Sequence, residues 1–262
     1  MTAIICVAQP KRGLLHVLTD AAQYRDGIVV SFGNKSAPVA QWPGVITASG
    51  SAFNISLFRS GLAQKFTTWD DMIAGAEDEL PDMVEGYGLS WSTVVLAGVS
   101  KERGPEVYSF TNEGELPDHI SKAEMDTSGY YADAFKLVKL PDVIMSPTVP
   151  TEVVIAANFE GIDADADPDL VTWSMRKHLI MQRHMPLPDG IGGIGGFAEL
   201  TTISANGVVQ RVIERWPADQ IGALLHHGQI DWDRWHGDNP KPCMSRLKRD
   251  MLSRKANRLR LV

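Results

Sequence analysis

Cysteine is scarce in this chain, which has only Cys6 and Cys243 among its 262 residues. The two are far apart in the sequence and nothing suggests a disulfide framework, which fits a reducing compartment. Long apolar runs are also missing, since no stretch approaches the roughly 20 apolar residues that span a bilayer. The N-terminus lacks the basic and then apolar pattern of a signal peptide. We therefore expect a cytoplasmic protein without a membrane partner.

Motifs for cofactors and metal ions do not occur in a convincing context. Residues 190–195 fit the pattern GxGxxG, but they lead into a strand, the reverse of the order in dinucleotide-binding units. The acidic run at 163–167 lacks the glycine and the last glutamate of an EF-hand loop, and favours a helix start over the alternative of a loose cation site. The histidines between 226 and 236 lack zinc-site spacing. We expect no cofactor and no metal ion.

Charge is distributed unevenly along the chain. The formal net charge is -7, but residues 241–262 hold eight Lys or Arg and one Asp, a net +7, so the remainder carries -14. A basic tail on an acidic body indicates an electrostatic contact. Its partner is nucleic acid, an acidic surface of a neighbouring subunit or the body of the same chain. The alternative is a solvated, partly helical tail.

Apolar periodicity and turn residues predict strands with helices between them. The expected strands are 2–8, 14–19, 27–32, 45–48, 92–99, 106–110, 197–204 and 208–216. The expected helices are 53–66, 70–84 and 168–183. Thr68 is the expected N-cap of the second helix, and Pro81 is expected to kink or shorten it. Residues 153–157 fit either a strand or a helix start.

This order of elements is satisfied by two antiparallel sheets with helices on their outer faces. Residues 1–216 form the expected domain. Residues 217–262 are a Trp-rich and then basic appendage, whose tryptophans we expect to dock on the domain or on a neighbour.

Thr2 opens the first expected strand, directly behind Met1. If Met1 is removed, this residue carries a hydroxyl and a free amine, which together form a nucleophile with its own base. The alternative is that Thr2 is an ordinary early residue of that strand, because many chains begin with Met-Thr.

Five short motifs follow Thr2 in order. The first hairpin ends in Thr19-Asp20-Ala21-Ala22, Lys35 follows a short strand, and a later strand ends in Ser49-Gly50-Ser51-Ala52. Next come the run from Gly104 to Tyr108 and a glycine-led closing hairpin at 195–207. With Thr2 these motifs cover residues 2–216, and they resemble those of the N-terminal-nucleophile (Ntn) hydrolases, specifically the proteasome β-subunit family.

The resemblance implies an α+β protein that forms a four-layer αββα sandwich of two antiparallel sheets flanked by helices. It also implies a hydrolase of peptide or amide bonds in which Thr2 is the nucleophile. The Lys35 ammonium would keep the Thr2 amine, with an ordinary pKa of about 7.7–8.0, neutral by charge repulsion. Asp20 would pair with Lys35, and the Gly50 N–H would stabilise the oxyanion. Asp189 matches a later aspartate of the family.

Two departures from the family pattern motivate a second hypothesis. The serine expected three residues after Asp189 is Gly192, and the family's other supporting serine has only Ser128 and Ser146 as weak matches. Because both serines support the amine in the family, the alternative is a catalytically silent subunit. Such a subunit would be a structural component of a homo- or hetero-oligomeric particle. The family usually assembles into rings, so we expect self-association.

Overall fold

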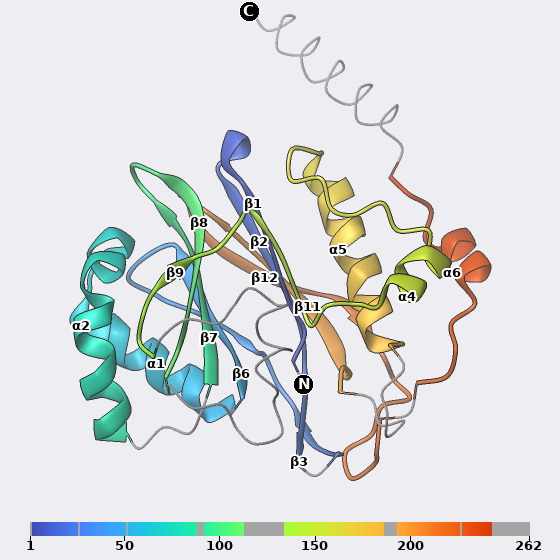
Figure 1. The fold of residues 1–262 in the computed structure, drawn as a ribbon, viewed down its shortest axis with the longest axis horizontal. Coiled ribbons are helices and arrows are strands. Elements are labelled where there is room, and N and C mark those ends of the chain that lie inside the picture. The colour runs from blue at the N-terminus through green and yellow to red at the C-terminus, as the bar shows by residue number, and fades with distance from the viewer. Residues whose placement is uncertain are drawn as a thin grey trace, which may run out of the picture.

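The computed structural model shows an α+β protein in which two antiparallel sheets lie between helices (Figure 1). The structure describes residues 2–25, 27–50, 52–87, 92–112, 134–185, 193–225 and 227–242. Asp189 and most of the basic tail lie outside these ranges.

One five-stranded sheet contains the first hairpin and the last. Its strands, in order across the sheet, are β10 (Val143–Ser146), β1 (Ile4–Gln9), β2 (Leu14–Asp20), β11 (Phe197–Ser204) and β12 (Gly207–Arg215). All neighbouring strands are antiparallel. The register places Ile4 opposite Thr19 and Ala198 opposite Asp20. The start of β1 and the start of β11 therefore flank the end of β2.

The second five-stranded sheet contains the central strands of the chain. Its order is β5 (Ser36–Pro38), β6 (Gly44–Gly50), β7 (Ser92–Ser100), β8 (Gly104–Thr111) and β9 (Val138–Lys139). A separate hairpin, β3 (Ala22–Arg25) with β4 (Ile28–Phe32), connects the two sheets along the chain. The helices are α1 (Ala52–Lys65), α2 (Trp69–Tyr87), α4 (Thr151–Ala156), α5 (Pro168–Arg183) and α6 (Trp232–Asp238).

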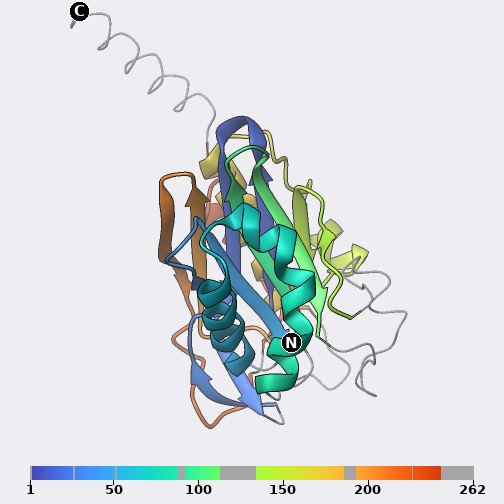
Figure 2. The ribbon, with the colours of Figure 1, turned by 90° about the vertical axis from the view of Figure 1, so that its left-hand side faces the viewer.

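Three apolar clusters show how these elements pack. Alternate residues of β1 and β2, such as Cys6 and Val17, meet Val95 and Val107 of the other sheet. Period-2 alternation sends the remaining side chains of each strand to the outer faces. There, α1 and α2 cover the sheet of β5–β9, and α5 covers the sheet of β1 and β2 (Figures 1 and 2). Burial on both faces explains why the first hairpin is apolar throughout.

Most of the expected elements are present, with small shifts at their ends. Thr68 caps α2 as predicted, since its Oγ1 accepts a hydrogen bond from the backbone N of Asp71 at 3.1 Å. Of the two effects expected of Pro81, a kink or a shorter helix, the shortening is wrong, because α2 continues to Tyr87. Pro81 lies on an exposed face, where water can bind the carbonyl that loses its helical donor. The ambiguous segment near residue 153 is helical, as α4.

The described part of the appendage packs against the domain. Trp235 of α6 is buried and its ring centroid lies 5.9 Å from that of Trp173 on α5. Leu225 is buried in a small cluster with Ala22 and Val29. The expected role of the tryptophans as docking residues is confirmed for Trp235. None of the helices in the described ranges is long and apolar enough to cross a membrane.

Candidate active site

Asp20 is the centre of the predicted site. It ends β2, and its side chain is completely buried. Its Oδ1 accepts hydrogen bonds from the backbone N of Ala3 at 3.1 Å and from Lys35 Nζ at 2.8 Å. Its Oδ2 accepts from the backbone N of Ala22 at 3.3 Å and of Gly195 at 3.2 Å. Donors from four separate segments therefore satisfy this buried carboxylate.

Lys35 lies directly before β5 and is only 4% exposed. Ser36 pairs with Thr47, so the same register places Lys35 beside the last part of β6, just before Gly50. A lysine is rarely buried without a partner, and Asp20 is that partner here. Because desolvation offsets much of the attraction in a buried ion pair, such a pair is weak evidence for stability. Its burial here favours a functional explanation.

Thr2 is half-buried and precedes the first residues of β1. The backbone N of Ala3 is bonded to the carbonyl carbon of Thr2, and it donates to the same oxygen of Asp20 that accepts from Lys35. The structure therefore brings the start of the chain, Asp20 and Lys35 together. Residues far apart in sequence meet because Ile4 pairs with Thr19, which places Ala3 beside Asp20.

Gly50 is the last residue of β6 and has a φ of +114°. Glycine adopts this conformation readily, whereas residues with a side chain rarely do. It pairs with Ser92 of β7. Ser92 Oγ accepts a hydrogen bond from Asn54 Nδ2, and the backbone N of Ser92 donates to Asn112 Oδ1, both at 2.6 Å. These buried polar residues, which the sequence analysis missed, hold the end of the strand pair against α1.

The remaining predicted residues are only partly placed by the structure. Asp189, Gly192 and Ser128 lie outside the described residues. Ser146 ends β10 and pairs with Ile4. Ser146 therefore lies beside the first residue of β1, which comes two residues after Thr2 in the sequence.

Gly195 is a site residue that the sequence analysis did not assign. Besides its N–H donation to Asp20, its carbonyl oxygen accepts from the backbone N of Ala21 at 3.1 Å and of Ala22 at 3.0 Å. A Cβ on residue 195 would lie 2.7 Å from Asp219 Oδ2, so only glycine permits this approach. The glycine pair that opens the closing hairpin was the available signal, but the contact with Asp20 depends on the tertiary fold.

Three histidines with lowered pKa values make no direct hydrogen bond to the Asp20–Lys35 pair in the described part of the chain, although His227 Nε2 lies 2.9 Å from the carbonyl oxygen of Ile194, next to Gly195. Burial lowers the pKa of His16, His178 and His227 to about 4, so each is neutral near pH 7. Within the described residues, none of the three hydrogen-bonds to Asp20 or Lys35. Among the described residues, the side-chain partner of the Asp20 carboxylate is therefore a lysine rather than one of these histidines.

Metal ligands do not converge in the described part of the chain, where no three His, Cys, Asp or Glu side chains form a cluster for an ion. The acidic turn before α5 has structural roles instead. Asp167 accepts a hydrogen bond from the backbone N of Asp169 at 3.0 Å and caps the helix. Asp165 pairs with Lys11 at 2.5 Å.

The chemistry available is therefore that of a fixed cation beside the first residues of the chain. An ammonium near an amine and a hydroxyl disfavours protonation of the amine and stabilises a developing alkoxide. Comparison with models of known protein families gives no match. The curated proteins likewise include none with significant similarity to this chain.

Proposed function

We propose that the protein is an N-terminal threonine hydrolase that cleaves peptide or amide bonds through Thr2 after removal of Met1. One observation carries the proposal: Asp20 Oδ1 accepts hydrogen bonds from both Lys35 Nζ and the peptide nitrogen that follows Thr2. A nucleophile that carries its own base needs no histidine, and a nearby fixed cation keeps that base unprotonated. The site has that composition.

The packing order supports assigning the fold to the four-layer αββα sandwich of the Ntn hydrolases. The layers run from α1 and α2 through the two sheets to α5. The three apolar clusters between them contain residues of both outer layers and both sheets. The proposed catalytic residues come from three separate places: Thr2 precedes β1, Lys35 precedes β5, and Gly50 ends β6.

The mechanism begins when the Thr2 hydroxyl attacks the carbonyl carbon of the substrate amide and its proton passes to the Thr2 amine. The carbonyl π electrons move to the oxygen, and the N–H of Gly50 stabilises the resulting alkoxide. When the alkoxide collapses, the C–N bond breaks and the leaving amine takes the proton from the Thr2 ammonium. Water then attacks the acyl ester, which releases a carboxylic acid and restores the hydroxyl.

Lys35 and Asp20 have separate roles in this mechanism. The Lys35 ammonium keeps the amine in its basic form and lowers the energy of the developing alkoxide. Asp20 holds that ammonium in place and also orients the backbone after Thr2. Asp189 is assigned a supporting role for the amine on the resemblance alone.

The test combines N-terminal sequencing, intact mass and a peptide epoxyketone, which needs both the hydroxyl and the amine of an N-terminal threonine. We expect a mass without Met1 and one adduct per chain at Thr2. Thr2→Ala should abolish the adduct, whereas the matched Thr2→Ser variant should retain it. A wild-type chain that keeps Met1 and forms no adduct would reject the proposal.

The second candidate function is that of a catalytically silent subunit in a self-associating particle. Gly192, in place of the family's serine, favours it, as does β12, which is the last strand of its sheet among the described residues and carries Val209 at 66% exposure. An unpaired strand edge can bind a neighbouring chain. In that case Thr2→Ala would leave both the particle mass and every measurable function unchanged.

A further inference from the structure

Asp219, near the start of the appendage, contacts the backbone next to the site residue Gly195. This residue follows β12 in a turn, and its Oδ2 accepts a hydrogen bond from the backbone N of Gly196 at 2.7 Å. Arg183, the last residue of α5, donates to both of its carboxylate oxygens, at 2.9 Å from Nη1 and 2.8 Å from Nη2. Both side chains are buried, with 7% of Arg183 and 6% of Asp219 exposed.

Arg183 is held on three sides. Besides the paired bonds to Asp219, its Nη1 donates to the carbonyl oxygen of Ile194 at 2.8 Å. Its guanidinium carbon lies 4.3 Å from the ring centroid of Trp216. A planar guanidinium can make these contacts at the same time, whereas the compact ammonium of lysine cannot.

These hydrogen bonds fix the residues on both sides of Gly195. Arg183 binds the carbonyl of Ile194, and Asp219 binds the N–H of Gly196. Gly195 itself donates to Asp20 Oδ2 and accepts from the backbone after Asp20. A short chain of contacts thus joins the Arg183–Asp219 pair to the carboxylate that holds the lysine of the site.

We propose that Asp219 and Arg183 are positioning residues, which set the place of Gly195 and through it the orientation of the Asp20–Lys35 pair. This inference rests on the proposed hydrolase function. It makes the first part of the appendage a component of the active site. Neither residue touches the substrate in this account.

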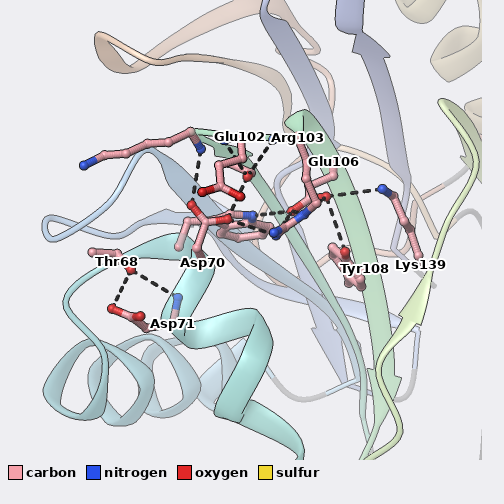
Figure 3. Close-up of polar contacts among 11 residues, drawn as sticks. Thr68, Asp70, Asp71, Glu102, Arg103, Glu106, Tyr108 and Lys139 are labelled. Atoms are coloured by element: carbon pink, nitrogen blue, oxygen red, sulfur yellow. Dashed lines mark hydrogen bonds and ion pairs between the residues drawn. The ribbon is translucent and has the colours of Figure 1, made fainter.

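A second buried carboxylate, at the opposite end of the central strands from Gly50, supplies a matched control. Glu106 of β8 accepts hydrogen bonds from Arg103 Nη2 at 2.6 Å and from Trp69 Nε1 at 2.9 Å (Figure 3). Its side chain is fully buried, and Lys139 lies at 3.3 Å. Among the described residues it has no contact with the site, so Glu106→Gln perturbs a comparable ion pair without reaching Gly195.

The experiment measures the rate of epoxyketone adduct formation as a function of pH for the wild type, Asp219→Asn, Arg183→Lys and Glu106→Gln. Rates are expressed per folded molecule, with folding checked by circular dichroism. We expect both site variants to react roughly ten- to a hundredfold more slowly and with a displaced pH midpoint, because a small misplacement of a catalytic group has effects of this size. Glu106→Gln should lower the Tm and leave the rate and the midpoint unchanged.

The outcomes separate the two proposals. If the wild type reacts at Thr2 and both site variants keep its rate and pH midpoint, the positioning role is overturned and the hydrolase function stands. If the wild type without Met1 does not react, the hydrolase function fails and the positioning role fails with it. If Asp219→Asn does not fold, Arg183→Lys decides the question. This variant keeps a cation beside Asp219 and loses the guanidinium's simultaneous contacts with Asp219, Ile194 and Trp216.

Discussion

Lys35 Nζ lies 2.8 Å from Asp20 Oδ1, and neither side chain has more than 5% of its surface exposed. This buried pair links the segment before β5 to the end of β2, where Asp20 Oδ1 also accepts from the backbone N of Ala3. Lys35→Met is expected to abolish reaction with an epoxyketone, because it removes the only cation that the described contacts place on Asp20. It should also lower the free energy of unfolding by about 3 kcal/mol, since one charge of a buried pair is left alone.

Epoxyketone labelling and urea titration measure the two effects separately. Lys11→Met is the control, because Lys11 forms an exposed ion pair with Asp165 and exposed pairs contribute little to stability. Full labelling of Lys35→Met at the wild-type rate would contradict the role given to the ammonium.

Buried histidines should make the fold sensitive to acid. The pKa of His178 is lowered by burial from 6.5 to about 4, and neither ring nitrogen has a hydrogen-bond partner in the described structure. As the pH falls, His178 therefore takes up a proton at a higher pH in the unfolded chain than in the folded protein. The contribution of His178 to stability should accordingly decrease as the pH drops from about 6.5 to 4 and be lost below pH 4.

This residue alone accounts for about 3 kcal/mol of that loss, taking 1.36 kcal/mol for each pKa unit. His178→Leu should reduce the slope between pH 6.5 and 4, as measured by urea titration at several pH values, and leave the contributions of His16 and His227 in place. His236→Leu, a change at a less buried position, is the control. An unchanged slope in His178→Leu would disprove the assignment.

Glu199 is the corresponding case for a carboxyl group. It lies 5% exposed on β11, and burial raises its pKa. Its Oε2 accepts a hydrogen bond from Gln210 Nε2 at 3.2 Å. The folded state favours the protonated form of Glu199. The stability that this group contributes is therefore present below its pKa in the unfolded chain and is lost as the pH rises through its higher pKa in the folded protein.

Glu199→Gln keeps an oxygen that can accept from Gln210 and removes the charge. We expect it to raise the urea midpoint at pH 8 relative to the wild type and to have little effect at pH 4. A variant that is less stable at pH 8 would show that Glu199 is ionised there with compensating contacts.

Gly98 should tolerate no side chain. A Cβ at this position of β7 would lie 2.4 Å from Cε3 of Trp69, whose ring is fixed by a hydrogen bond to Glu106. Gly98→Ala should therefore cost about 1–3 kcal/mol, as overpacking of a core does.

Gly86 is the matched position, because it lies in α2 and a Cβ added there would meet no atom within 4 Å. Gly86→Ala should be neutral or stabilising by about 0.5–1 kcal/mol, because alanine favours the helix. Thermal unfolding of the two variants gives the comparison. Equal stability of both would contradict the packing argument for Trp69.

Local sequence patterns predicted the long elements well, because each is encoded by its own periodicity and turn residues. The strands at β1, β2, β7, β11 and β12 alternate or are apolar throughout, and α5 begins at a proline that suits its first turn. The short strands β3, β5, β9 and β10 were missed. These strands have too few residues to show a periodic pattern. They are strands because they hydrogen-bond to neighbouring strands in the folded protein.

The residues of the candidate site were chosen from short motifs, and their placement together was decided only by the tertiary structure. The sequence by itself determined an α+β chain and named Thr2, Asp20 and Lys35. The register of β1 against β2 decided that Asp20 meets the start of the chain. Gly195, Arg183 and Asp219 could not be predicted as a unit, because backbone hydrogen bonds and close packing between distant segments carry no local pattern.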